Sequence, residues 1–152
     1  MKNLELLFEN KLESASVVTT ASTENNLGVE NLLNEDKSFI MKTTSAQDFS
    51  ITYTYSKATN INAFCLAQYN FVGTTTLRVR IWSTDDTGLT PAYDSGVSSV
   101  VLRKIWGIDW IWGVDNVHGQ DAEEADDIFL LTFEGVSCKV MQVDIVDSSN
   151  PN

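Results

Sequence analysis

The segment DFSITYTY, residues 48–55, decides the class of fold. Aromatic and aliphatic side chains occupy every second position and hydroxyl side chains stand between them: the apolar set is Phe49, Ile51, Tyr53 and Tyr55, and the polar set is Ser50, Thr52 and Thr54. Successive side chains of a strand point to opposite faces of a sheet. This alternation therefore predicts a strand with one face in a core and the other in solvent.

Further runs of this kind predict an antiparallel β-sandwich. TLRVRIW at residues 76–82 alternates in the same way, whereas INAFCLAQY at residues 61–69 is apolar on both faces and predicts a strand covered on both sides. Other expected strands are LELLF, SVVTTAS, VSSVVLRK, DIFLLTF and CKVMQVDIV, at residues 4–8, 16–22, 97–104, 127–133 and 138–146. Segments that contain Gly, Asn, Asp or Pro separate the strands and predict turns at residues 56–60, 71–75, 84–96 and 134–137.

A single domain spanning residues 1–152 accounts for the length and composition. The chain is 43% hydrophobic, which suits one core, and we find no repeat or low-complexity linker that divides it. VENLLNEDK at residues 29–37 predicts a short helix with Leu32 and Leu33 beneath the sheet. We expect an all-β fold with at most one or two helical turns and with long loops.

The net charge of the chain limits the classes of partner that it can bind. The formal net charge is −11, so nucleic acid and anionic membrane surfaces would repel it. No apolar run approaches the roughly 20 residues that span a bilayer, and the first residues, MKNLELLFENKLE, do not have the pattern of a signal peptide. We therefore expect synthesis in a cytoplasm and neither membrane insertion nor nucleic-acid binding.

The two cysteines, Cys65 and Cys138, lie in strand-like apolar runs. Cysteine is among the most buried residue types, so we expect two buried free thiols. The sequence contains no CxxC motif for metal or redox chemistry.

Neither a catalytic motif nor a cofactor motif stands out. His118 is the only histidine, and no GxSxG elbow accompanies it, so we expect no enzyme. An acidic run at residues 121–127 has the oxygen ligands that Ca²⁺ prefers, at Asp121, Glu123, Glu124, Asp126 and Asp127. Its spacing does not match an EF-hand loop, so a solvated loop is favoured, with a Ca²⁺ site as the alternative.

Three side chains of one predicted strand face form the first contact candidate. Arg78, Arg80 and Trp82 share a face, on which a ring can stack against a sugar and guanidinium groups can bind carboxylates. The alternative is that a second sheet covers this face and the arginines reach its rim.

The segment IWGIDWIWG at residues 105–113 is the second contact candidate, because it holds three of the four tryptophans. Its glycines indicate a loop, and Trp106, Trp110 and Trp112 carry more apolar area than one loop can hide. We expect Trp106 to be mostly core, and Trp110 and Trp112 to dock against a partner protein. Sugar stacking is the rival interpretation, with polar support from Asp109, Asp115 and Asn116.

The order of short motifs resembles a group of bacteriophage tail-associated proteins with a discoidin-like (galactose-binding-like) jelly-roll domain. The motifs are TAST, VENL, MKT, AQYN, TLRVR and YDSG, at residues 20–23, 29–32, 41–43, 67–70, 76–80 and 93–96. Met41 stands where that group tends to have Trp. The resemblance implies a jelly-roll sandwich and a component of a virion.

These observations give two expectations for function. The first is a non-enzymatic structural component of a phage tail or tail-like particle, which contacts other tail proteins in a multi-copy assembly. The alternative is a carbohydrate-binding module of the tail that attaches to host surface glycans. Binding to a glycan array that is lost on Trp110→Ala or Trp112→Ala would favour the alternative.

Overall fold

The computed structural model describes residues 10–34, 40–67, 71, 75–100 and 128–147. Strands dominate this part of the chain, and every pairing between them is antiparallel. The elements in chain order are two 3₁₀ helices and six strands: η1 (Leu12–Ser14), β1 (Ala15–Thr19), η2 (Val29–Leu33), β2 (Phe49–Ala67), β3 (Thr76–Trp82), β4 (Tyr93–Asp94), β5 (Ser98–Ser99) and β6 (Ile128–Val146). Among the described residues, no helix is long and apolar enough to cross a membrane.

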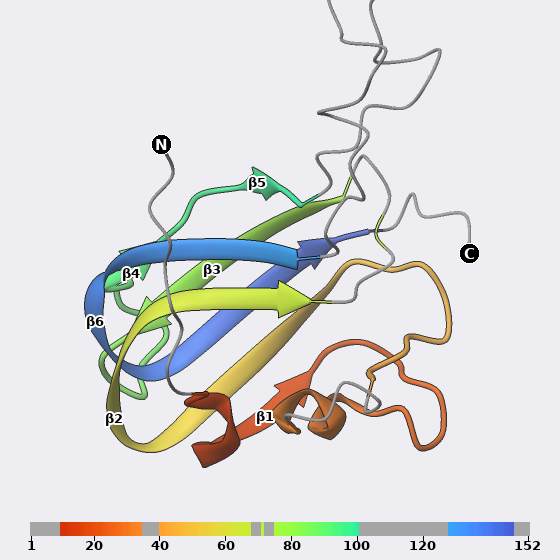
Figure 1. Ribbon diagram of the computed structural model, residues 1–152, viewed down its shortest axis with the longest axis horizontal. Coiled ribbons are helices and arrows are strands. Elements are labelled where there is room, and N and C mark those ends of the chain that lie inside the picture. The colour runs from red at the N-terminus through yellow and green to blue at the C-terminus, as the bar shows by residue number, and fades with distance from the viewer. Residues whose placement is uncertain (1–9, 35–39, 68–70, 72–74, 101–127, 148–152) are drawn as a thin grey trace, which may run out of the picture.

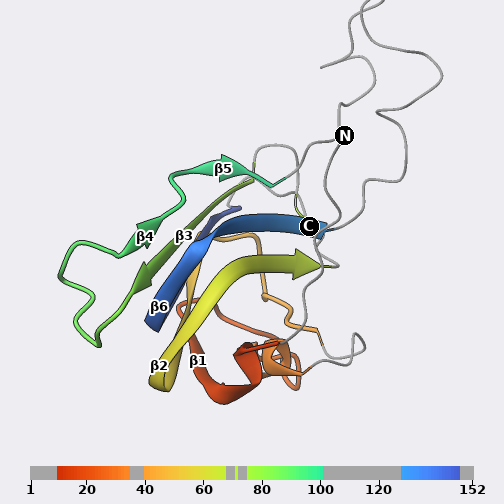
Figure 2. The same cartoon turned by 60° about the vertical axis from the view of Figure 1, so that its left-hand side comes forward.

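Two long strands build most of the sheet. The order is β1-β2-β6-β3-β4, with β5 beside β3, and β2 and β6 are 19 residues long each. Figures 1 and 2 show that both strands curve back on themselves, so that their halves lie in opposite layers. One layer contains β1, the first half of β2, the second half of β6 and β3; the other contains the remaining halves of β2 and β6.

Register shifts accompany the bend. The pairing of β2 with β6 shifts between Thr54 and Thr59 and again between Ile61 and Ala63. Extra residues in one strand of a pair bend it and increase its twist. The shifts therefore turn both strands through the bend while they remain paired on either side of it.

The core lies between the two layers. Its buried side chains come from alternate positions of the strands, including Ile51, Tyr53 and Tyr55 of β2, Leu77, Val79 and Ile81 of β3, and Met141, Val143 and Ile145 of β6. The alternation predicted for residues 49–55 and for residues 77–81 is thus confirmed. The short helix predicted near residue 29 is η2, and its Leu32 and Leu33 pack against the core, as expected.

Three sequence-based expectations about the strands are wrong. The turns predicted at residues 56–60 and 134–137 lie inside β2 and β6, where the chain bends without leaving the sheet. Gly135 serves this bend, since a Cβ there would lie 3.1 Å from the side chain of Asn60. The strand at residues 61–67 is not covered on both sides, because the register shift breaks its parity and exposes Cys65.

The cysteines have different environments. Both are free thiols, but Cys138 is fully buried and Cys65 is exposed, so the expectation that both are buried holds for Cys138 alone. Of the other expected strands, residues 4–8 lie outside the described residues. Residues 97–104 are described only to Val100, and Ser98–Ser99 is the strand found there.

Candidate functional site

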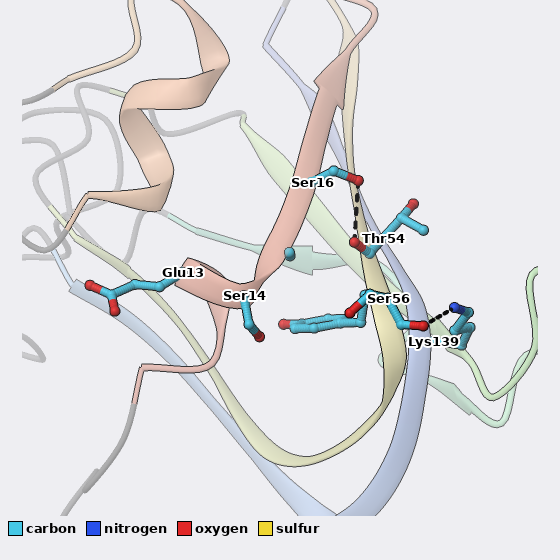
Figure 3. A pocket seen from close by; sticks show the side chains of 8 residues that line it. Glu13, Ser14, Ser16, Thr54, Ser56 and Lys139 are labelled. Carbon is cyan, nitrogen blue, oxygen red and sulfur yellow. Dashed lines mark hydrogen bonds between the residues drawn. The ribbon is translucent and has the colours of Figure 1, made fainter.

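A polar groove lies where the first strand of the sheet meets the bend of the two long strands (Figure 3). Its volume is about 390 Å³, and its lining comes from η1, β1, β2 and β6: Glu13, Ser14, Ala15, Ser16, Thr54, Tyr55, Ser56 and Lys139. The described part of the lining therefore combines hydroxyl groups with the carboxylate of Glu13 and the ammonium group of Lys139.

Local hydrogen bonds fix the wall formed by η1. The side chain of Asn10 accepts a bond of 3.0 Å from the backbone N–H of Leu12, and the Ser14 hydroxyl donates to the Lys11 carbonyl over 2.9 Å. Such side-chain bonds satisfy backbone groups at the ends of a short helix. They hold Glu13 and Ser14 at the mouth of the groove.

The strands place the other polar groups. Ser16 of β1 and Thr54 of β2 are register partners, and the Ser16 hydroxyl donates to the Thr54 carbonyl over 3.2 Å. At the far end, Lys139 Nζ donates to the Ser56 carbonyl over 2.9 Å and lies 3.6 Å from the carboxylate of Asp85. Figure 3 shows Glu13 and Lys139 at opposite ends of the lining.

A second depression adjoins the groove and shares Glu13 with it. Its volume is about 360 Å³, and it is lined by Glu13, Glu30, Leu33 and Asn34. The two depressions together run from η2, past η1, to the bend. The carboxylates lie toward η2 and the lysine lies at the bend.

The floor of the groove is neutral at physiological pH. Burial raises the pKa of Tyr55, which lines the groove, to about 12. The phenol therefore keeps its proton. The lining thus offers hydrogen bonds and two charges of opposite sign to a ligand.

The arginines predicted as partner contacts are already paired. Arg78 forms a two-pronged bond with Asp94, with Nε–Oδ1 and Nη2–Oδ2 distances of 2.8 and 2.5 Å, and Arg80 Nη2 lies 2.6 Å from Asp144 Oδ2. The hydrogen bond from Arg78 holds the pKa of the Asp94 carboxyl at about 2. The partners are on the neighbouring strands β4 and β6, which the sequence pattern did not bring together.

Trp82, which the sequence offered either as a contact residue or as part of a covered sheet face, is buried in the structure. It is 3% exposed, and its Nε1–H donates to the Leu89 carbonyl over 2.8 Å. The guanidinium of Arg80 lies 5.4 Å from the centroid of its ring, and Val140, its buried register partner, shares its sheet face. The loop that follows β3 therefore covers the ring, which sequence parity could not reveal.

The other predicted site residues lie outside the described residues. They are Trp106, Trp110, Trp112, Asp109, Asp115 and Asn116, together with the acidic run Asp121, Glu123, Glu124, Asp126 and Asp127. Among the residues that the structure does describe, no three His, Cys, Asp or Glu side chains gather in a way that could hold a metal ion. The Ca²⁺ alternative for the acidic run stays a prediction.

Sequence reasoning missed the groove. Its residues belong to four elements, and Ser56 and Lys139 were assigned to a turn and to an ordinary strand. Ser16 and Thr54 each alternate with more buried residues along their strands, which indicates that their side chains face away from the core. This pattern does not indicate that the two residues pair with each other across β1 and β2. The groove depends on the bend, which the sequence did not predict.

Comparison with known proteins identifies the architecture. No protein-family model matches the chain, and no curated protein sequence matches it. Among solved structures, it is similar to chitosan-binding modules 1 and 2 of a chitosanase/glucanase from Paenibacillus sp. IK-5, each with a TM-score of 0.56. The identities are 11% and 12%, and the similarity covers 90% and 91% of this chain and 86% and 88% of those modules. The fold is a jelly-roll sandwich.

A larger protein contains a similar domain. The chain is similar to part of a putative alpha-L-fucosidase from Bacteroides thetaiotaomicron, with 11% identity and a TM-score of 0.55. The match covers 90% of this chain and 25% of that protein, so the chain corresponds to a quarter of its length. These similarities confirm the predicted all-β jelly-roll class. The structure of module 2 is of its complex with chitotriose, and this binding is known for that module.

Proposed function

We propose that this chain is a glycan-binding module that acts by binding and not by catalysis. The observation that carries the proposal is the groove lined by Ser14, Ser16, Thr54, Ser56 and Lys139 with Glu13 at its mouth. The similarity in fold to two chitosan-binding modules supports it. Proteins of the same fold bind different ligands, so the proposal depends mainly on the chemistry of the groove.

The chemistry of the groove suits a saccharide. A sugar hydroxyl is both a donor and an acceptor, and the hydroxyls of Thr54 and Ser56 have the same double capacity. The hydroxyls of Ser14 and Ser16 donate to backbone carbonyls and can accept a hydrogen bond from a sugar hydroxyl. The carboxylate of Glu13 adds a strong acceptor, and the ammonium of Lys139 adds strong donors. The volume of about 390 Å³ lies within the range of about 300–1,000 Å³ that is typical of small-molecule sites.

Blocking the groove tests the proposal. Ser16 is exposed on the edge strand β1 and lines the groove, so Ser16→Trp would fill it with a ring that a strand tolerates. Val18 is on the same face of the same strand, is 63% exposed and does not line the groove, so Val18→Trp is the matched control. On a glycan array, we expect Ser16→Trp to lose at least about tenfold in affinity, or about 1.4 kcal/mol, and Val18→Trp to bind normally.

The same array distinguishes the groove from the tryptophan segment. If Trp110→Ala or Trp112→Ala abolishes glycan binding while Ser16→Trp leaves it unchanged, then the glycan site is at the tryptophans and the groove is not the site. If the wild-type chain retains no glycan, the proposal is wrong.

A place in a phage tail is the second candidate function, and the order of motifs from residue 20 to residue 96 favours it. In this role the chain is a component of the virion that contacts other tail proteins in several copies, and the glycan-binding function would attach the tail to a host surface. Electron microscopy of purified particles that contain the chain would support this candidate. Particles that assemble and infect normally without the chain would rule it out.

A further inference from the structure

Among the residues that the structure describes, Lys139 is the one cationic side chain in the lining of the groove, and most of it is buried. Its side chain is 20% exposed, in a chain whose formal net charge is −11. One N–H bonds to the Ser56 carbonyl, which leaves two further donors on the ammonium group. A partly buried ammonium group that lines a groove attracts a negatively charged ligand group more strongly than an exposed one does.

The nearby carboxylate of Asp85 does not saturate this charge. The distance from Lys139 Nζ to Asp85 Oδ1 is 3.6 Å, which is longer than a hydrogen bond, and the side chain of Asp85 is 73% exposed. Ion pairs with an exposed partner contribute little, since water competes for the charge. A ligand carboxylate can therefore replace or supplement Asp85 at small cost.

Glu13 makes the groove asymmetric. It lies at the end of the lining opposite to Lys139, and it also lines the second depression, next to Glu30 (Figure 3). These two carboxylates disfavour negative charge at their end of the groove. The net charge of the rest of the chain acts weakly on a bound ligand, because salt screens exposed charges beyond about 8 Å at physiological ionic strength.

We infer that Lys139 makes the groove selective for glycans that contain a uronic acid, with the sugar carboxylate at Lys139 and a neutral sugar toward Glu13. This inference rests on the proposed glycan-binding function and specifies its ligand. It makes Lys139 the residue that determines specificity, since the hydroxyl groups of the lining serve neutral and acidic sugars alike.

Isothermal titration of the whole chain with two probes tests the inference. The acidic probe is a hyaluronan tetrasaccharide, in which glucuronate alternates with N-acetylglucosamine, and the neutral probe is the tetramer of N-acetylglucosamine. We expect the acidic probe to bind about tenfold more tightly than the neutral one. Lys139→Gln should weaken binding of the acidic probe about tenfold, or about 1.4 kcal/mol, and leave the neutral probe within about twofold.

Two further variants separate specificity from folding and from net charge. Lys57→Gln removes the same charge from an exposed neighbouring position of β2 that does not line the groove, and we expect it to bind both probes normally. Asp85→Asn removes the competing carboxylate without touching the lining. We expect it to raise the affinity for the acidic probe about two- to threefold.

The outcomes distinguish the inference from the function on which it rests. Equal binding of both probes by the wild-type chain, or a preference for the acidic probe that survives in Lys139→Gln, overturns the inference and leaves glycan binding in place. If Lys139→Gln unfolds, an unchanged Asp85→Asn variant overturns the inference by itself. If neither these probes nor a glycan array shows any binding, the proposed function is wrong and the inference with it.

Discussion

Replacing Trp82 is the clearest test of whether this residue belongs to the core or to a binding surface. The sequence places it on an outward strand face with two arginines, but the structure buries it beneath the loop that follows β3. Trp82→Ala would leave a cavity on that face, and replacing a buried tryptophan by alanine costs about 3–5 kcal/mol. In a domain of this size, 1 kcal/mol corresponds to about 2–4 °C, so we expect the melting temperature to fall by about 6–20 °C.

Trp82→Phe separates the contribution of apolar burial to this loss of stability from the contribution of the hydrogen bond. Phenylalanine keeps most of the apolar area and the ring beneath Arg80, and it removes the N–H that bonds to the Leu89 carbonyl. A hydrogen bond contributes about 0.5–1.5 kcal/mol, and Leu89 is 57% exposed, so water can satisfy its carbonyl. We expect Trp82→Phe to cost about 1–2 kcal/mol, measured as the shift of the urea-unfolding midpoint.

Val18→Ala is the control, because Val18 is exposed and its truncation should change stability by less than about 0.5 kcal/mol. Trp82→Ala should still bind glycan wherever it is folded. If Trp82→Ala melts within 2 °C of the wild type and loses glycan binding, the ring is a ligand platform and our assignment of it to the core is wrong.

Three further outcomes are expected. Gly96 has a φ of +67°, so Gly96→Ala should cost about 1–2 kcal/mol in chemical unfolding, while an unchanged midpoint would show that the turn tolerates a Cβ. Arg78 lowers the pKa of Asp94 in the folded chain from 3.8 to about 2, so the pair stabilises the fold above about pH 4, and this contribution is lost as the pH falls toward 2. The melting temperature of Asp94→Asn should therefore lack this dependence on pH. A thiol reagent should label Cys65 in the folded chain and Cys138 only after unfolding, and rapid labelling of Cys138 in the folded chain would contradict its burial.

Much of the sheet could be predicted from the sequence, because burial on one face of a strand imposes a period of two. The positions of Ile51, Tyr53, Leu77 and Val79 follow from that rule alone. The bend could not be predicted, since Gly135 and its neighbours are typical of a turn that reverses the chain. Pairing with a partner strand decides between a bend and a turn, and that pairing joins residues about 80 positions apart, such as Thr59 and Cys138.

The candidate site was less predictable than the fold for the same reason. Ser16, Thr54 and Lys139 become neighbours only when β1 and β6 pair with β2 on either side. The residues singled out from the sequence were tryptophan, arginine and clustered acidic or amide side chains, which have a strong individual chemistry. A single serine or threonine hydroxyl does not stand out in a sequence as a candidate binding residue. Such hydroxyls form a site only when the fold brings several of them together.

The motifs TLRVR and YDSG have a physical explanation in the structure. TLRVR forms β3 and YDSG forms β4 with the turn after it, and the two segments are locked together by the bonds from Arg78 to Asp94 and from the backbone N–H of Val79 to the Ser95 hydroxyl, the latter over 2.9 Å. Asp94 also accepts the N–H of Gly96, whose left-handed conformation closes the turn. A change in one motif would therefore leave groups of the other without partners, so the two are expected to occur together wherever this edge of the sandwich forms. The bonds between them account for this edge of the sheet, and neither motif contributes a described lining residue to the groove at the bend.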